Sequence, residues 1–132
     1  NTKDENLINS WREIDIEFSR WNNEDNDNSQ FVVQPWNHYT NPIFRFNIEN
    51  TAYKDTIHAI IWKEEYIAFQ SAYGGTYPPD KEDIIQEWRY SGPCVPDPGN
   101  AKAHLNLWLI NGNPPSDALE QEMIIKDFRF LE

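Results

Sequence analysis

Alternation of apolar and polar residues along most of the chain is the feature that most restricts its fold. In residues 11–18, WREIDIEF, every second side chain from Ile14 to Phe18 is apolar. A period of two is what a β-strand with one buried face produces. Short segments of this kind recur between polar or Pro/Gly-rich loops, and this pattern predicts an antiparallel all-β sandwich or barrel. The predicted strands are residues 11–18, 29–36, 42–48, 56–62, 65–73, 103–110 and 122–131.

Two stretches between these strands are informative. Lys63-Glu64 predicts a tight hairpin between the fourth and fifth strands, and residues 81–90 fit either a helical turn or another strand. No internal repeat or linker interrupts the pattern. Because 132 residues are enough to bury one core, residues 1–132 are predicted to form a single domain.

The charge balance excludes some classes of function. The net charge is -11, and no cluster of Lys and Arg is longer than a pair, which argues against a nucleic-acid binder. No apolar run approaches the ~20 residues of a membrane span. A single cysteine, Cys94, excludes an internal disulfide. The chain begins at Asn1 and not at a methionine, so we expect a processed or partial chain, exported to the periplasm, the cell surface or the medium.

Three carboxylates mark one predicted strand. Glu13, Asp15 and Glu17 are two residues apart and therefore lie on one face, while Ile14, Ile16 and Phe18 lie on the other and point into the core. Three like charges in a row raise the pKa of at least one of them, and a proton donor beside an ionised carboxylate is what glycoside hydrolysis requires. The structural alternative is an exposed face whose acids pair with Lys or Arg on neighbouring strands. Spacing alone leaves both interpretations open.

Other side chains suit a carbohydrate cleft. A sugar ring presents C–H groups to an aromatic face and hydroxyls to polar side chains. In residues 103–110, polar and aromatic residues alternate with leucines, as on a cleft floor, and other candidates lie on strands or at strand ends; the alternative for each is a solvent-facing surface or packing at the rim. The candidate substrate-binding residues are Trp108, Asn106, His104, Gln30, Gln34, Trp21 and Trp36.

Metal chemistry has weaker support. The loop of residues 24–28 carries the oxygen ligands that calcium prefers, but it lacks the glycine and the distal glutamate of an EF-hand. A solvated hairpin loop is the favoured interpretation, with a structural calcium ion as the alternative. No cofactor is predicted to be required.

The segment Glu-Ile-Asp-Ile-Glu-Phe, residues 13–18, resembles the active-site signature of glycoside hydrolase family 16, the group of the laminarinases and lichenases. Later segments resemble later strands of that family in the same order: Gln30-Phe31, Ile60 to Trp62, Tyr66 to Phe69, Leu105 to Trp108, and Ile124 to Phe130. The resemblance implies an all-β fold, an antiparallel sandwich of the concanavalin A-like jelly-roll type. The chain would be its C-terminal part.

The resemblance also implies roles for the carboxylates. Glu13 matches the nucleophile, Asp15 the assisting acid between the two glutamates, and Glu17 the general acid/base. The implied activity is hydrolysis with retention, or transglycosylation, within a β-linked polysaccharide such as β-glucan. Only ten residues precede Trp11, where the family has several strands of the cleft. A companion chain or segment that supplies these strands is therefore an expected partner, beside the polysaccharide; a smaller sandwich and a fragment are the alternatives.

Two rival functions remain open. A carbohydrate-binding or assembly module would keep the carboxylate strand but lack catalysis. A structural β-sandwich would carry its acidic face without any ligand.

Overall fold

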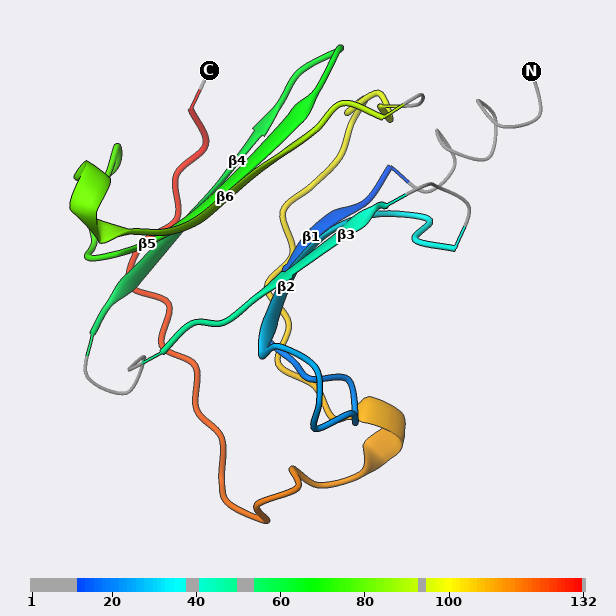
Figure 1. Ribbon diagram of the computed structural model, residues 1–132, viewed down its shortest axis with the longest axis vertical. Coiled ribbons are helices and arrows are strands. Elements are labelled where there is room, and N and C mark those ends of the chain that lie inside the picture. Colours follow the sequence, from blue (N-terminus) through cyan, green and yellow to red (C-terminus); the bar gives the residue numbers. More distant parts are fainter. Residues whose placement is uncertain (1–11, 38–40, 50–53, 93–94, 132) are drawn as a thin grey trace. The chain divides into compact units, whose positions relative to one another are not determined.

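The computed structural model describes residues 12–37, 41–49, 54–92 and 95–131 (Figure 1). It is all-β, with two antiparallel sheets of three strands each. Strands follow one another in sequence order within each sheet. The first sheet contains β1 (Ile14–Glu17), β2 (Ser29–Val33) and β3 (Ile43–Phe46), and the second contains β4 (Thr56–Trp62), β5 (Ile67–Tyr73) and β6 (Ile84–Tyr90). Among the described residues, helix is limited to two short 3-10 turns, η1 (Lys81–Asp83) and η2 (Ile110–Gly112).

The chain divides into two compact units. The first, Asn1–Ala101, contains both sheets, and the second, Lys102–Glu132, contains η2. Among the described residues of the second unit no strand is formed.

Most of the predicted strands are confirmed. β4 has the bounds that the alternation predicted, and β1, β2, β3 and β5 lie within their predicted ranges. Trp11, at the start of the first predicted strand, lies outside the described residues. The hairpin at Lys63 is confirmed, since its N–H donates to the carbonyl of Tyr66 at 2.9 Å. Residues 81–90 combine both alternatives, because η1 leads directly into β6.

The predictions of strands at residues 103–110 and 122–131 are wrong. Both segments lie outside regular structure except at Ile110, and nearly all their side chains are exposed. Alternation shows which side chains share a face, but a strand also needs a neighbour whose N–H and C=O groups complete the ladder. No described residue pairs with either segment in this way.

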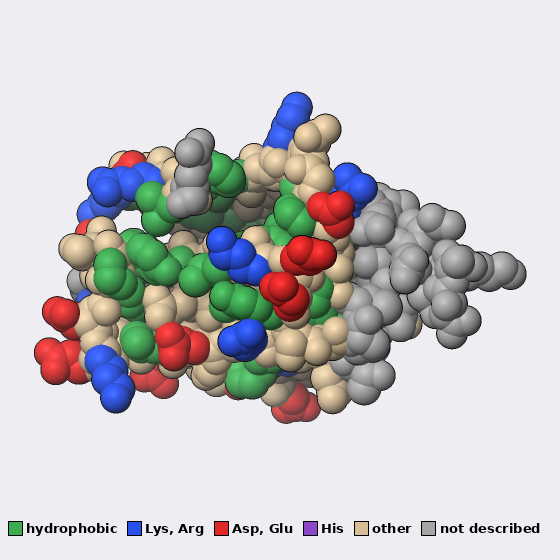
Figure 2. Space-filling view, turned by 90° about the horizontal axis from the view of Figure 1, so that it is seen from above, with side chains coloured by type: hydrophobic (Ala, Val, Ile, Leu, Met, Phe, Trp, Pro, Cys, Tyr) green, Lys and Arg blue, Asp and Glu red, His purple; other side chains and the backbone are tan. Residues whose placement is uncertain are grey.

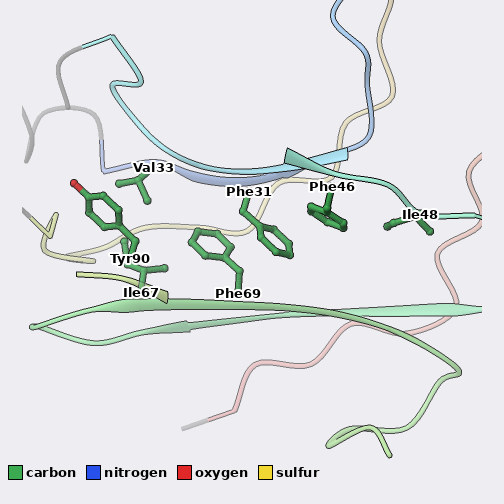
Figure 3. Packing of buried hydrophobic residues seen from close by; sticks show 7 residues of the cluster. All are labelled: Phe31, Val33, Phe46, Ile48, Ile67, Phe69 and Tyr90. Carbon is green, nitrogen blue, oxygen red and sulfur yellow. The ribbon is translucent and has the colours of Figure 1, made fainter. Parts of the chain in front are cut away.

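The core of the first unit lies between its two sheets (Figure 3). Phe31 from β2 stacks on Phe69 from β5, with ring centroids 5.1 Å apart. Side chains of both sheets meet here because alternate residues of each strand point toward the other sheet, which is the packing of a β-sandwich. The buried cluster consists of Phe31, Val33, Phe46, Ile48, Ile67, Phe69 and Tyr90.

The core face of β1 agrees with the alternation except at its end. Ile14 and Ile16 pack against the buried cluster. Phe18, which the pattern also placed in the core, is 52% exposed, and its ring lies 4.9 Å from that of His58. Phe18 follows the last residue of the strand, so the two-residue period no longer sets its direction.

No described helix is both long and apolar enough to cross a membrane. On the face shown in Figure 2, basic side chains are scattered among acidic and hydrophobic ones and form no basic patch.

Candidate active site

The carboxylate face of β1 is set by its pairing with β2. Glu17 lies opposite Gln30 and Asp15 opposite Val32, while Ile16 lies opposite Phe31 of the core. Residues directly opposite in antiparallel strands point to the same side of the sheet. Asp15, Glu17 and Gln30 therefore share the face that points away from the core.

Glu17 is held by two donors. Its Oε2 atom accepts hydrogen bonds from Nε2 of Gln30 and, at 3.2 Å, from Nε1 of Trp21. Burial raises the pKa of Glu17 above its usual value; these two hydrogen bonds and the charge of Arg45 oppose the rise, and the charge of Glu13 adds to it. Two residues predicted to bind substrate, Gln30 and Trp21, thus contact the predicted acid/base instead.

Asp15 has a similar environment. Its Oδ2 atom accepts a hydrogen bond from Nε2 of Gln34 at 3.0 Å. Burial raises the pKa of Asp15 to about 6. The hydrogen bond from Gln34 lowers this pKa, and the charges of Glu13 and Glu17 raise it further. Oε1 of the same Gln34 amide accepts a hydrogen bond from the backbone N–H of Trp36 at 3.2 Å. Gln34 therefore links Asp15 to the turn after β2.

The three acids differ in their access to water. Glu13 is exposed, whereas Asp15 and Glu17 are partly buried. The charge of Glu13 raises the pKa of both Asp15 and Glu17. Because removal from water disfavours the charged form, a proton is retained on this face near pH 6. An exposed carboxylate next to a protonated carboxyl group can supply a nucleophile and a proton donor.

The structural alternative required the acids to pair with cations. Among the described residues, no Lys or Arg forms a salt bridge with Asp15 or Glu17, and both accept hydrogen bonds from neutral side chains. Neutral donors lower the pKa of a carboxyl group less than a close cation would, so burial still raises the pKa of both Asp15 and Glu17 above the usual value.

The remaining predicted site residues lie apart from this cluster or in the second unit. Trp36 is 58% exposed at the turn after β2. Trp108 is 60% exposed, and His104 and Asn106 are exposed as well. These three belong to the second unit, so their part in a cleft stays a prediction.

The acidic loop before β2 is joined by its own hydrogen bonds. The guanidinium of Arg20 donates to the backbone carbonyls of Glu24 and Asn26, and Asp27 accepts from Nδ2 of Asn47. A cation of the chain thus already contacts two carbonyl oxygens of this loop. In the part of the chain that the structure describes, no three His, Cys, Asp or Glu side chains form a metal-binding group, and the calcium ion stays a prediction.

Sequence reasoning missed Arg45. It lies on β3 opposite Gln30, on the carboxylate face, and its charge lowers the pKa of Glu17. The signal was present: Arg45 alternates with Phe44 and Phe46 in a predicted strand, which turns the cation away from the core. Which strand lies next to β3 was not readable from the sequence.

No protein-family model, curated protein or solved structure matches this chain.

Proposed function

We propose that the chain is a retaining, endo-acting glycoside hydrolase or transglycosylase of the jelly-roll type, acting on a β-linked polysaccharide. The observation that carries the proposal is the pair of partly buried carboxyl groups on β1. Burial raises the pKa of Glu17 and brings that of Asp15 to about 6, next to the exposed carboxylate of Glu13. The resemblance of residues 13–18 to the family 16 signature supports the same assignment.

In the proposed reaction, the carboxylate of Glu13 attacks the anomeric carbon while the carboxyl group of Glu17 protonates the departing glycosidic oxygen. Glu17, now ionised, then takes a proton from the water or sugar hydroxyl that displaces Glu13. Asp15 lies between the two glutamates in the sequence and acts as the assisting acid, which holds a proton when one of the glutamates is ionised. Water gives hydrolysis and a sugar hydroxyl gives transglycosylation, both with retention at the anomeric carbon.

Glu13→Gln and Glu17→Gln test the assignment on a panel of soluble β-glucans and β-galactans. Each substitution keeps the size of the side chain but removes either the nucleophile or the titrating proton, and we expect turnover to fall at least about a hundredfold with binding retained. Reducing-end release and affinity electrophoresis measure the two quantities. Unchanged turnover in both variants would show that β1 is not catalytic.

The matched control is Glu87→Gln. Glu87 is an exposed glutamate on β6 that accepts a hydrogen bond from Gln70 at 2.6 Å, on the other sheet. This variant should keep full turnover. With Glu13→Ala, added azide should restore turnover by taking the place of the nucleophile, and the product should be a glycosyl azide of inverted configuration.

A carbohydrate-binding module is the second candidate, favoured by the exposed indole of Trp36. It predicts glycan affinity that is lost in Trp36→Ala and no turnover in the unsubstituted protein. If turnover is present, or if the Trp36→Ala variant binds as tightly as the unsubstituted chain, this candidate is excluded.

A further inference from the structure

One row of side chains crosses all three strands of the first sheet. Glu17 on β1 lies opposite Gln30 on β2, and Gln30 lies opposite Arg45 on β3. Cβ atoms of directly opposite residues are about 4.5–5.5 Å apart, so each side chain in the row can reach the next. The row places a carboxylate, an amide and a guanidinium in that order.

Two atoms in the row have no hydrogen-bond partner. Oε1 of Gln30, an acceptor, and Nη1 of Arg45, a donor, are both buried, and no described residue is a hydrogen-bond partner of either atom. Gln30 as a whole is only 4% exposed, although its Nε2 donates to Glu17. Buried polar atoms are almost always satisfied, because an unpaired one forfeits the hydrogen bonds that it made to water.

The two unsatisfied atoms are complementary, since one needs a donor and the other an acceptor. They belong to directly opposite residues and are both shielded from solvent. A polysaccharide cannot reach atoms in this position, so they do not form a subsite for a ligand. What they can do is satisfy each other.

We propose that Arg45 is a positioning residue for Glu17: a small movement of the two opposite side chains lets its Nη1 donate to Oε1 of Gln30, and this bond fixes the amide whose Nε2 donates to Glu17. The relay rests on the proposed function only in the role given to Glu17. The rest follows from the register and from the two unsatisfied atoms.

The relay has an electrostatic consequence. An amide anchored on a guanidinium presents its Nε2 donor steadily to the carboxylate, and the guanidinium adds its own positive charge at the end of the row. Both effects favour the ionised form of Glu17, against the burial that raises its pKa. Arg45 would thus determine how readily Glu17 gives up its proton.

The test is a carbon-13 NMR titration of the glutamate carboxyl groups in the full chain, with the Glu17 signal assigned from its loss in Glu17→Gln. In Arg45→Met the midpoint of Glu17 should move to higher pH. In Arg45→Lys, which keeps the charge but not the planar guanidinium, the midpoint should lie between those of Arg45→Met and the unsubstituted protein. Arg89→Met is the control, because Arg89 is exposed on β6 of the second sheet and stacks over Tyr66, which directly precedes β5, 3.7 Å from its ring centroid.

A midpoint for Glu17 in folded Arg45→Met that equals the one in Arg89→Met overturns the relay. If Arg45→Met fails to fold, the relay is tested in the unsubstituted protein by the signals of Gln30 and Arg45. The side-chain amide signals of Gln30 should follow the titration of Glu17, and the guanidinium protons of Arg45 should exchange slowly; rapid exchange overturns the proposal. None of these measurements uses a substrate, so a chain without glycosidase activity can still confirm the relay. In an active enzyme, kcat should fall about tenfold in Arg45→Met with little change in KM.

Discussion

Asp15 keeps a carboxyl group largely out of water while the residues on both sides of it on the same face are also acidic. Only Gln34 donates to it among the side-chain hydrogen bonds of the described residues. A neutral acid is tolerated in such a place, but a carboxylate is not fully compensated. A site that keeps a proton near neutral pH is therefore expected to lower the stability of the fold above that pH.

Asp15→Asn should stabilise the protein at pH 7. The pKa of Asp15 is raised to about 6 in the folded state, above its unfolded value of 3.8, so the folded state binds the proton more tightly. Its favourable contribution is present below about pH 4 and is lost as the pH rises through 6. Asparagine keeps the acceptor for Gln34 and never ionises, so the expected gain at pH 7 is about 1–2 kcal/mol after allowance for solvent screening.

Urea unfolding at pH 7 and pH 4 measures this gain, which should disappear at pH 4, where the aspartate is protonated as well. Glu64→Gln, in the exposed turn between β4 and β5, is the control and should change stability by less than about 0.5 kcal/mol at either pH. An Asp15→Asn variant that is no more stable than the unsubstituted protein at pH 7 would contradict the raised pKa of Asp15 in the folded state. If the proposed function holds, the same variant loses turnover while it gains stability.

Among the elements, two strands have neighbours on both sides. β2 lies between β1 and β3, and β5 lies between β4 and β6. Their N–H groups can donate to either neighbour, whereas each outer strand has one edge without a described partner. The presence of at least one paired neighbour separates the correct strand predictions from the wrong ones, since residues 103–110 alternate as regularly as residues 56–62 but pair with no described strand.

Amide hydrogen exchange should be slowest in the central strands, intermediate in the outer strands and fastest in the unpaired segments. Amides of β2 and β5 should exchange most slowly, outer strands should show alternating protection, and residues 103–110 and 122–131 should exchange at rates near those of an unstructured chain. Two-dimensional NMR after transfer to deuterated buffer resolves these classes, with the exposed turn residues Glu64 and Glu65 as the internal reference for rapid exchange. Alternating slow amides within 103–110, comparable to those of β6, would show that this segment does form a strand.

For the first unit as a whole, His58 joins the sheets. It lies on β4, its ring contacts Phe18 at the end of β1, and its two nitrogens lie 2.9 Å from the hydroxyls of Ser71 and Thr56. A neutral imidazole satisfies both hydroxyls, because one nitrogen donates and the other accepts. Burial lowers the pKa of His58 from 6.5 to about 4, so the imidazole stays neutral in the folded protein well into the acid range.

A fall in pH should therefore lower the free energy of unfolding of the first unit, because His58 is neutral in the folded state. The unfolded state takes up the proton near pH 6.5, before the folded state does near pH 4, so stability falls as the pH decreases between these values. The expected loss is about 2 kcal/mol, since a part of the ring still contacts solvent. Asp15 acts in the opposite direction over the same range and masks part of the effect.

Guanidinium chloride unfolding of His58→Gln at several pH values measures the contribution of His58 to the pH dependence of the free energy of unfolding. Glutamine keeps donors and acceptors for the hydroxyls but does not titrate, so its deficit relative to the unsubstituted protein should shrink as the pH falls from 7 to 4. A deficit that stays constant over this range would falsify the role of His58. Comparison with Asp15→Asn in the same series separates the two groups.

The sequence alone determined which side chains of β1 share a face. Asp15 and Glu17 follow from a two-residue period, because side-chain direction along a strand is a property of the local backbone, and Glu13 directly precedes the strand. The same local rule located β1 to β5, left residues 81–90 open between a helical turn and a strand, and predicted the all-β class. It also turned Arg45 away from the core, because Arg45 lies between Phe44 and Phe46.

Only the tertiary structure decided what faces the carboxylates. Gln30, Gln34 and Arg45 lie far from β1 in the sequence, and they reach Asp15 and Glu17 through the register of β1 with β2 and of β2 with β3. Register depends on contacts between distant residues, and a shift by one residue would turn every side chain of a strand to the other face. The burial that raises the pKa of Asp15 has the same origin, since the surroundings of a side chain are set by the packing of the whole unit and not by its neighbours in the chain.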